Sequence, residues 1–241
     1  MSTLISRRAV LWAMAAAAPD HGFVLVHGAW HGSWCWARVL ELLAERGVKA
    51  AAPCLTGVGE RVKEVTASTT IATHVDDVVK ACEPFSRVTL VGHSYAGLVI
   101  TPACNQLSEK LDALVYLDAF LPANGQSGFD LMKQSFGDHW REKAAGGLLV
   151  PPMLSMKSMG VDDPALDKKL TGHPLATMEA KIAFDEAKWS KVKKRYLRCK
   201  KYSGFGPTAT RAKTLGFEVK ELDSGHDAML AAPQALVDAL L

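Results

Sequence analysis

The stretch Val88-Thr89-Leu90-Val91-Gly92-His93-Ser94-Tyr95-Ala96-Gly97 decides the fold, because an apolar run ends there in a tight turn around a serine. Residues 88–91 are predicted to form a buried strand, and residues 96–107 the following helix. A serine between a strand and a helix occupies a strained turn that exposes its hydroxyl group, as a nucleophile elbow does. The pattern departs from G-x-S-x-G only at Ala96, and alanine is still small. A chance Gly-Ser turn is the alternative, which the flanking strand and helix disfavour.

On both sides of this turn, short apolar runs alternate with helical patterns, which predicts an α/β fold with a parallel sheet and crossover helices. The expected strands are 23–26, 48–52, 88–91, 113–117, 196–199 and 217–222, and the expected helices are 36–46, 74–82, 96–107, 208–215 and 233–241. A chain of 241 residues fits one large domain of this class, which we expect to span residues 19–241.

The segment from about 121 to 190 breaks the alternation. It contains Pro151-Pro152, Gly146-Gly147 and five methionines: Met132, Met153, Met156, Met159 and Met178. An insertion of this length in an α/β chain is usually a functional lid, so we predict a cap over the site. Methionine would give that cap a soft, adaptable apolar lining, although each methionine by itself also fits a role as core filler.

Residues 1–18 have the pattern of an export signal. Arg7 and Arg8 stand without any acidic neighbour before an apolar run that ends in four alanines, and residues 6–11 match a twin-arginine motif. The segment is too short for a membrane-spanning helix, which needs about 20 apolar residues. We therefore expect a periplasmic or secreted protein. The alternative is an ordinary alanine-rich helix on a cytoplasmic protein.

Composition excludes several other classes of protein. The formal charge of +3 gives no electrostatic reason to expect a nucleic acid or a membrane surface as partner. The basic stretch 188–201 includes apolar residues and is interpreted as a strand with a solvated approach. The five cysteines are odd in number and lack CxxC spacing, which argues against a disulfide framework or a zinc site. His27 and His31 lack a third ligand, so we expect loop packing there and no metal site.

A serine nucleophile needs a base and donors for the oxyanion. His226 follows the last expected strand, which is where the order Ser, acid, His places the base. The backbone N–H of Tyr95, next to Ser94, is one expected oxyanion donor. Ala29, after Gly28 in the loop behind the first strand, is the other.

The acid of the triad is harder to place. Residues 202–213, after the penultimate strand, contain no Asp or Glu, although the acid often stands there. Asp118 ends the strand 113–117, and sites of parallel sheets lie outside such strand ends, so we predict Asp118 as the acid. The alternatives are a capping role for Asp118, or Asp223 or Asp227, which are close to His226 in sequence.

Five sequence segments together resemble those of a known family. They are 23–32 (FVLVHGAWHG), 55–61 (LTGVGER), 92–95 (GHSY), 116–122 (YLDAFLP) and 225–229 (GHDAM). From Phe23 to the C-terminus the chain resembles the α/β-hydrolase branch that contains bacterial pyrethroid-type esterases, plant methyl-salicylate esterases and plant hydroxynitrile lyases. The resemblance implies an α/β-hydrolase fold, with a mostly parallel sheet, helices on both faces and an inserted helical cap, and cleavage of carboxylic esters without a cofactor.

Two residues favour an esterase over a lyase. The lyases look to need a threonine in the oxyanion loop and a lysine after the catalytic histidine, and this chain has Ala29 and Asp227 there. We expect hydrolysis of apolar or aryl small-molecule esters through an acyl-enzyme. Trp30, Phe120 and Met229 are expected to contact the substrate. A hydroxynitrile-lyase-like enzyme and a non-catalytic ligand-binding protein remain the alternatives.

Overall fold

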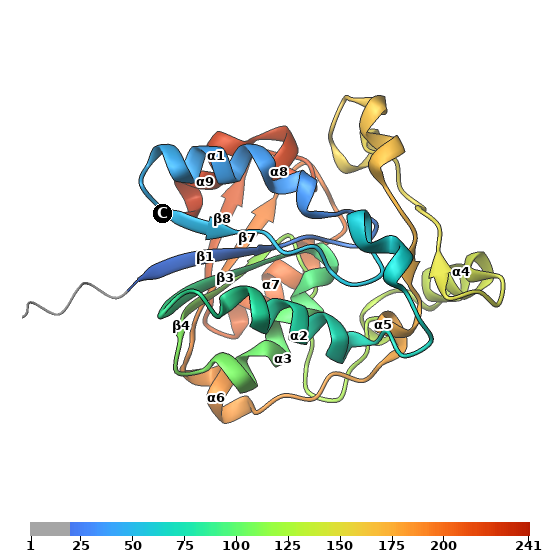
Figure 1. The fold of residues 1–241 in the computed structure, drawn as a ribbon, viewed down its shortest axis with the longest axis horizontal. Coiled ribbons are helices and arrows are strands. Elements are labelled where there is room, and N and C mark those ends of the chain that lie inside the picture. Colours follow the sequence, from blue (N-terminus) through green and yellow to red (C-terminus); the bar gives the residue numbers. More distant parts are fainter. Residues whose placement is uncertain (1–19) are drawn as a thin grey trace, which may run out of the picture.

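A six-stranded parallel sheet forms the centre of the computed structural model, which describes residues 20–241 (Figure 1). Its order is β2-β1-β3-β4-β7-β8. The strands are β1 His21–Val26, β2 Lys49–Ala51, β3 Arg87–His93, β4 Leu111–Leu117, β7 Lys193–Cys199 and β8 Glu218–Leu222. Each predicted strand is present, and the prediction of a parallel sheet is confirmed. The predicted export signal in residues 1–18 lies outside the described residues.

Helices cover both faces of the sheet. The larger ones in the alternating part are α1 Ala37–Glu45, α2 Ile71–Cys82, α3 Gly97–Leu107, α7 Gly206–Thr214 and α9 Pro233–Leu240, with a single turn α8 Ala228–Ala231. All five predicted helices are present. The helix predicted from residue 74 starts earlier, at Ile71, where the Thr70 N–H donates to the Thr73 hydroxyl oxygen (3.1 Å). Ile71 continues the buried face of Val75 and Val78, and the Thr70–Thr73 capping box closes this first turn.

Alternation along β1 explains why two cores form. Val24 and Val26 point into one cluster of buried residues, which includes residues of α2, α3 and α7. Phe23 and Leu25 point into the other, with residues of α1, α8 and α9. Successive side chains of a strand lie on opposite faces, so a strand that is apolar at every position requires helices on both sides. Figure 1 shows α1, α8 and α9 on one side of the sheet and α2 and α3 on the other.

The segment between β4 and β7 contains the predicted insertion. Its elements are α4 Gln134–Ala144, β5 Leu149–Val150, β6 His173–Pro174, α5 Ala176–Glu179 and α6 Glu186–Lys191, with 3-10 turns Phe129–Leu131, Lys157–Met159 and Pro164–Lys169. β5 and β6 pair antiparallel. Figure 1 places α4 and α5 beyond one end of the sheet, whereas α6 lies back beside α3.

The methionines of this segment do not share one environment. Met178 belongs to the large core, against which Met132 and Met153 pack, but Met156 and Met159 form a small separate cluster with Val161. The prediction that methionines line a cap is therefore wrong for Met156 and Met159, which instead fix the 3-10 turn at 157–159.

All five cysteines are free, and only Cys54 is not fully buried. Within residues 20–241, the apolar helices are all too short to cross a bilayer.

Candidate active site

Ser94 occupies a strained turn between β3 and α3. Its φ of +53° lies in the left-handed region, which residues with a side chain rarely adopt. A side chain on Gly92 would come within 2.9 Å of the Ala96 carbonyl oxygen, and one on Gly97 would collide with the Phe120 carbonyl oxygen. Ala96, at the second glycine position of the G-x-S-x-G pattern, is fully buried. The close approach of the Phe120 backbone therefore requires a glycine at position 97.

His226 and Asp118 are brought together from distant parts of the chain. His226 Nδ1 donates to Asp118 Oδ2 at 2.8 Å, and both side chains are buried. A carboxylate only accepts hydrogen bonds, so the Nδ1 atom carries the ring proton and the lone pair of Nε2 remains available. Asp118 Oδ1 accepts from the Cys199 N–H (3.2 Å) and lies 3.6 Å from the Arg198 guanidinium. Asp118 has a φ of +41°, which turns its carboxylate away from the strand path.

The other two candidate acids face elsewhere. Asp223 is exposed and pairs with Lys201 at 3.1 Å. Asp227 is fully buried, and its Oδ2 accepts from His31 Nε2 at 3.0 Å. Neither carboxylate contacts Nδ1 of His226, as the short sequence separation suggested.

The loop after β1 lies against the elbow. A side chain on Gly28 would come within 3.0 Å of Ser94 Cβ, so the backbone of 28–29 runs directly beside Ser94. The phenolic hydroxyl of Tyr95 hydrogen bonds to His74 Nδ1 at 2.9 Å, which holds this side chain beneath the elbow. Trp30 has a φ of +65°, and this turn redirects the chain after Ala29.

A small cavity of about 80 Å³ opens between these loops. Ser94, His226, Ala29, Tyr95, Trp30 and Phe120 line it, together with Met132, Phe136, Trp140, Leu154, Met178, Tyr202 and Phe205. The cavity contains no charged side chain of Asp, Glu, Lys or Arg among its described lining residues. No hydrogen bond joins Ser94 Oγ to His226 within residues 20–241, and such contacts are often long in an unliganded enzyme.

The prediction that Met229 contacts the substrate is wrong. Met229 lies in α8, where it is fully buried in the core on the α1 and α9 side of the sheet, and it does not line the cavity. The chain turns after Asp227 and carries Met229 away from the site. Proximity to His226 in sequence was therefore a poor guide to contact with the substrate.

Four aromatic residues of the cavity were not predicted from the sequence: Phe136, Trp140, Tyr202 and Phe205. Trp140 of α4 stacks near Trp30, with ring centroids 4.8 Å apart. Tyr202 and Phe205 stack on the His226 ring, at 4.5 Å and 5.4 Å. Tyr202 and Phe205 occupy the loop that often contains the acid of the triad. Aromatic residues in that loop could have indicated from the sequence that they lie beside His226.

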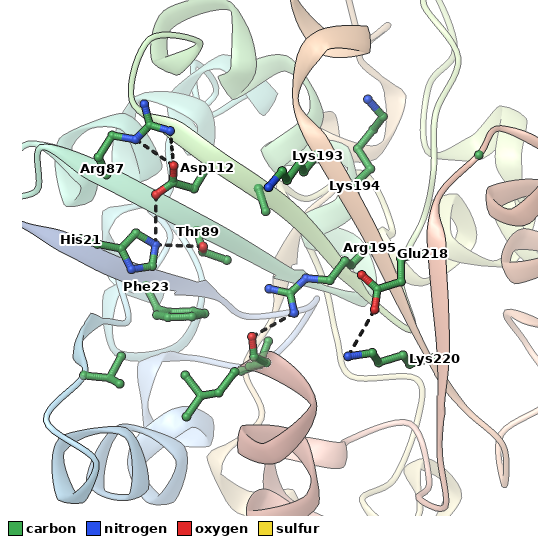
Figure 2. Close-up of a pocket in the computed structure, with 15 residues that line it drawn as sticks. His21, Phe23, Arg87, Thr89, Asp112, Lys193, Lys194, Arg195, Glu218 and Lys220 are labelled. Carbon is green, nitrogen blue, oxygen red and sulfur yellow. Dashed lines mark hydrogen bonds and ion pairs between the residues drawn. The ribbon is translucent and has the colours of Figure 1, made fainter. Parts of the chain in front are cut away.

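A wider groove of about 930 Å³ lies at the amino-terminal ends of the strands, away from the elbow (Figure 2). Its charged side chains pair mostly among themselves. Asp112 pairs with Arg87, and Glu218 with Lys220 at 3.2 Å (Figure 2). Because sites of parallel sheets lie at the carboxyl ends of the strands, we place the candidate active site in the smaller cavity.

One group of potential metal ligands was found among residues 20–241: His93, His226 and Asp227. Each already has an internal partner. His93 Nε2 donates to the His226 carbonyl oxygen (3.1 Å), while His226 and Asp227 bond to Asp118 and His31. The group is better described as a buried hydrogen-bonded cluster.

The family model described as "Alpha/beta hydrolase family" matches residues 23–239. The chain belongs to the alpha/beta hydrolase family. This confirms the fold class and the family that the sequence motifs indicated.

Named relatives of this alpha/beta hydrolase include esterases. It is 33% identical over 239 residues to a carbendazim hydrolyzing esterase of Nocardioides sp. (strain SG-4G), covering 90% of this chain and 97% of the relative. It is 28% identical over 255 residues to esterase PIR7B of Oryza sativa subsp. japonica, covering 91% and 94%.

Solved structures share its fold. An extracellular alpha/beta-hydrolase from a Paenibacillus species superposes with a TM-score of 0.80 at 22% identity, covering 92% of this chain and 98% of the other. A pyrethroid hydrolase from Sphingobium faniae gives a TM-score of 0.72 at 19% identity, with coverage of 91% and 96%. At these identities the likeness concerns the fold alone.

Proposed function

We propose that Ser94, His226 and Asp118 are the nucleophile, general base and orienting acid of this carboxylic ester hydrolase. The observation that carries the proposal is the 2.8 Å hydrogen bond from His226 Nδ1 to Asp118, because it leaves Nε2 able to accept a proton. Ser94 and His226 also line the same cavity. A binding protein would need neither the strained serine nor the oriented histidine.

The reaction follows from these positions. Ser94 Oγ attacks the ester carbonyl carbon while His226 Nε2 takes the hydroxyl proton, and Asp118 stabilises the imidazolium that forms. The amides of Tyr95 and Ala29 donate to the oxyanion. His226 then protonates the departing alcohol. In the second half it activates water, which releases the acid from Ser94.

The substrate class follows from the lining of the cavity. Its walls are aromatic and aliphatic side chains, including Trp30, Phe120 and Trp140, which gain from burial of hydrocarbon at about 25 cal/mol per Å². We therefore propose apolar or aryl esters, beneath a cap formed within 121–190. Carbendazim in the name of a relative that is 33% identical supports this class.

A fluorophosphonate probe tests the nucleophile. The enzyme should be labelled on Ser94 and should hydrolyse p-nitrophenyl esters, and Ser94→Ala should lose both properties while its circular dichroism is unchanged. Ser86→Ala, an exposed serine distant from the elbow, is the matched control and should behave as the wild type. Hydrolysis by Ser94→Ala near the wild-type rate would contradict the proposal. Cyanide release from cyanohydrins without ester hydrolysis would favour the lyase.

We also propose that residues 1–18 direct export. The support is the motif at 6–11 and the alanine run before Pro19. Mature protein outside the cytoplasm should begin near Pro19, and replacing both Arg7 and Arg8 by Lys should retain it inside. N-terminal sequencing that finds intact Met1 on cytoplasmic protein in the native host would refute this.

A further inference from the structure

His31 has a hydrogen-bond acceptor at each ring nitrogen. Nδ1 lies 2.8 Å from the Ala29 carbonyl oxygen, and Nε2 lies 3.0 Å from Asp227 Oδ2. A carbonyl oxygen and an ionised carboxylate only accept hydrogen bonds, so with Asp227 ionised both ring nitrogens carry a proton and His31 is an imidazolium. His27 provides the contrast. Its Nδ1 donates to the Gly28 carbonyl oxygen, but its Nε2 accepts from the Leu55 N–H (3.1 Å), so that ring is neutral.

Asp227 balances the charge of His31. Burial by itself would raise the pKa of Asp227, but the charge and hydrogen bond of His31 lower this pKa to about 2. The two side chains are 2% and 0% exposed. Together they form a fully buried ion pair, in which the loss of one partner would leave an uncompensated charge in the interior.

This ion pair joins two loops that the reaction needs. His31 lies two residues after Ala29, and Asp227 is next to His226. His93, next to Ser94, adds a third connection, because its Nε2 donates to the His226 carbonyl oxygen at 3.1 Å. The loops after β1, β3 and β8 are therefore fastened to one another behind the cavity.

We propose that the His31–Asp227 ion pair is a clamp that fixes the Ala29 amide relative to the His226 imidazole. The two residues are positioning residues for the ester hydrolysis proposed above, on which this inference rests. Oxyanion donors act only when they are already aimed at the developing charge, and a displacement of about 1 Å can cost 10²-fold in rate. Neither side chain lines the cavity, so the clamp affects turnover and leaves binding of the ester largely unchanged.

Three variants of the clamp test this: Asp227→Asn, His31→Gln and the double variant. Each single variant should lower kcat at least tenfold and leave KM within about twofold. The double variant should lose no more than the worse single variant, because a clamp is lost when either half is lost. The double variant also contains no unpaired buried charge, so it should fold even where a single variant does not.

A second His–Asp pair offers a matched control. His21 Nε2 lies 3.4 Å from Asp112 Oδ2 at the other end of the sheet (Figure 2). His21→Gln and Asp112→Asn should leave kcat at the wild-type value.

Two results would overturn the clamp: a folded double variant with wild-type kcat, or losses in the two single variants that multiply in the double one. If instead Ser94→Ala retains hydrolysis, it is the proposed function that fails. If Ser94→Ala is inactive and the clamp variants are fully active, only the inference fails.

Discussion

Strained backbone at single residues marks the site. Among residues 20–241, four residues other than glycine have a positive φ, and three of them are Trp30, Ser94 and Asp118. Such conformations persist only where the surroundings determine them. Phe120 N–H donates to the Ser94 carbonyl oxygen, and Asp118 N–H donates to that of Leu197, so Ser94 and Asp118 are each fixed by a neighbouring strand or loop.

Replacing Asp118 by asparagine should reduce kcat by up to about 10⁴-fold, because an amide no longer fixes the useful tautomer of His226 or stabilises its imidazolium. The measurement is ester hydrolysis at saturating substrate, with circular dichroism to show that the variant is folded. Asp223→Asn, at an exposed carboxylate, is the control and should stay close to the wild type. Activity of Asp118→Asn within tenfold of the wild type would place the acid elsewhere.

Sequence reasoning could propose Ser94 and His226 because the local pattern and the order along the chain suffice for them. It proposed Asp118 because residues 202–213 contain no acid and because Asp118 follows the carboxyl end of a strand. The role of His31 depends on Asp227, which is 196 positions away. No pattern within the loop of residues 27–32 shows which histidine faces two acceptors. His27 and His31 were therefore both interpreted as loop-packing residues.

At the scale of elements, the inserted segment touches the histidine loop directly. The Asp227 N–H donates to the Met159 carbonyl oxygen (3.2 Å), and Gly160 and Gly225 pack backbone against backbone. A side chain on Gly225 would come within 2.5 Å of Gly160 Cα. The position of His226 therefore depends partly on the 3-10 turn at 157–159.

Gly225→Ala should separate the two segments, with a loss of roughly 1–3 kcal/mol in the free energy of unfolding and a lower kcat. Chemical denaturation and ester hydrolysis measure the two effects. Gly147→Ala, in an exposed part of the same insertion, is the control. Wild-type stability and turnover in Gly225→Ala would show that the contact is easily relaxed.

The helix α4 contributes Trp140 to the cavity, where it is only 2% exposed. Trp140→Ala should lower kcat/KM more for aryl or medium-chain esters than for acetate, because only the larger groups would bury hydrocarbon against this ring. The ratio of kcat/KM for benzoate and acetate esters of one alcohol measures this. Leu148→Ala, on the exposed surface of the insertion, should leave the ratio unchanged. An equal loss for both esters would argue against contact with the acyl group.

The strands β1, β3 and β4 were predictable because each contains a buried apolar run between turns, whereas the insertion has no such regularity. β5 and β6 have two residues each and depend on pairing with one another. Trp140, Tyr202 and Phe205 reach the cavity only through the packing of whole elements, so periodicity gave no reason to select them.

At the scale of the whole molecule, four buried histidines make stability depend on pH. Burial lowers the pKa of His27 and of His74 to about 4 and brings that of His93 and His173 well below the ordinary value. Below pH 6.5 the unfolded chain binds protons at these residues that the folded chain does not. The contribution of these neutral histidines to the free energy of unfolding is therefore fully present above pH 6.5 and is lost as the pH falls toward 4. For His27 and for His74 the loss is about 3 kcal/mol each at pH 4.

The Tm should consequently fall steadily from pH 7 to pH 4.5, and unfolding at pH 5.5 should take up protons. Calorimetry in buffers of different ionisation heat measures both quantities. His139→Gln, at an exposed histidine, should leave the curve unchanged. The clamp opposes the trend, because His31 has a raised pKa and stabilises most below pH 6.5. A constant Tm across this range would mean that the buried rings accept protons without cost.

The order of the strands also determines when activity arises. Ser94 and Asp118 are synthesised more than a hundred residues before His226, whose loop is held in place only after β8 has paired with β7 at the edge of the sheet. An incompletely folded chain thus holds Ser94 without the base that we propose for it, and it should not acylate itself on esters that it meets too early. The return of ester hydrolysis then reports the final step of folding. In refolding experiments, it should come later than the return of the far-ultraviolet circular dichroism signal.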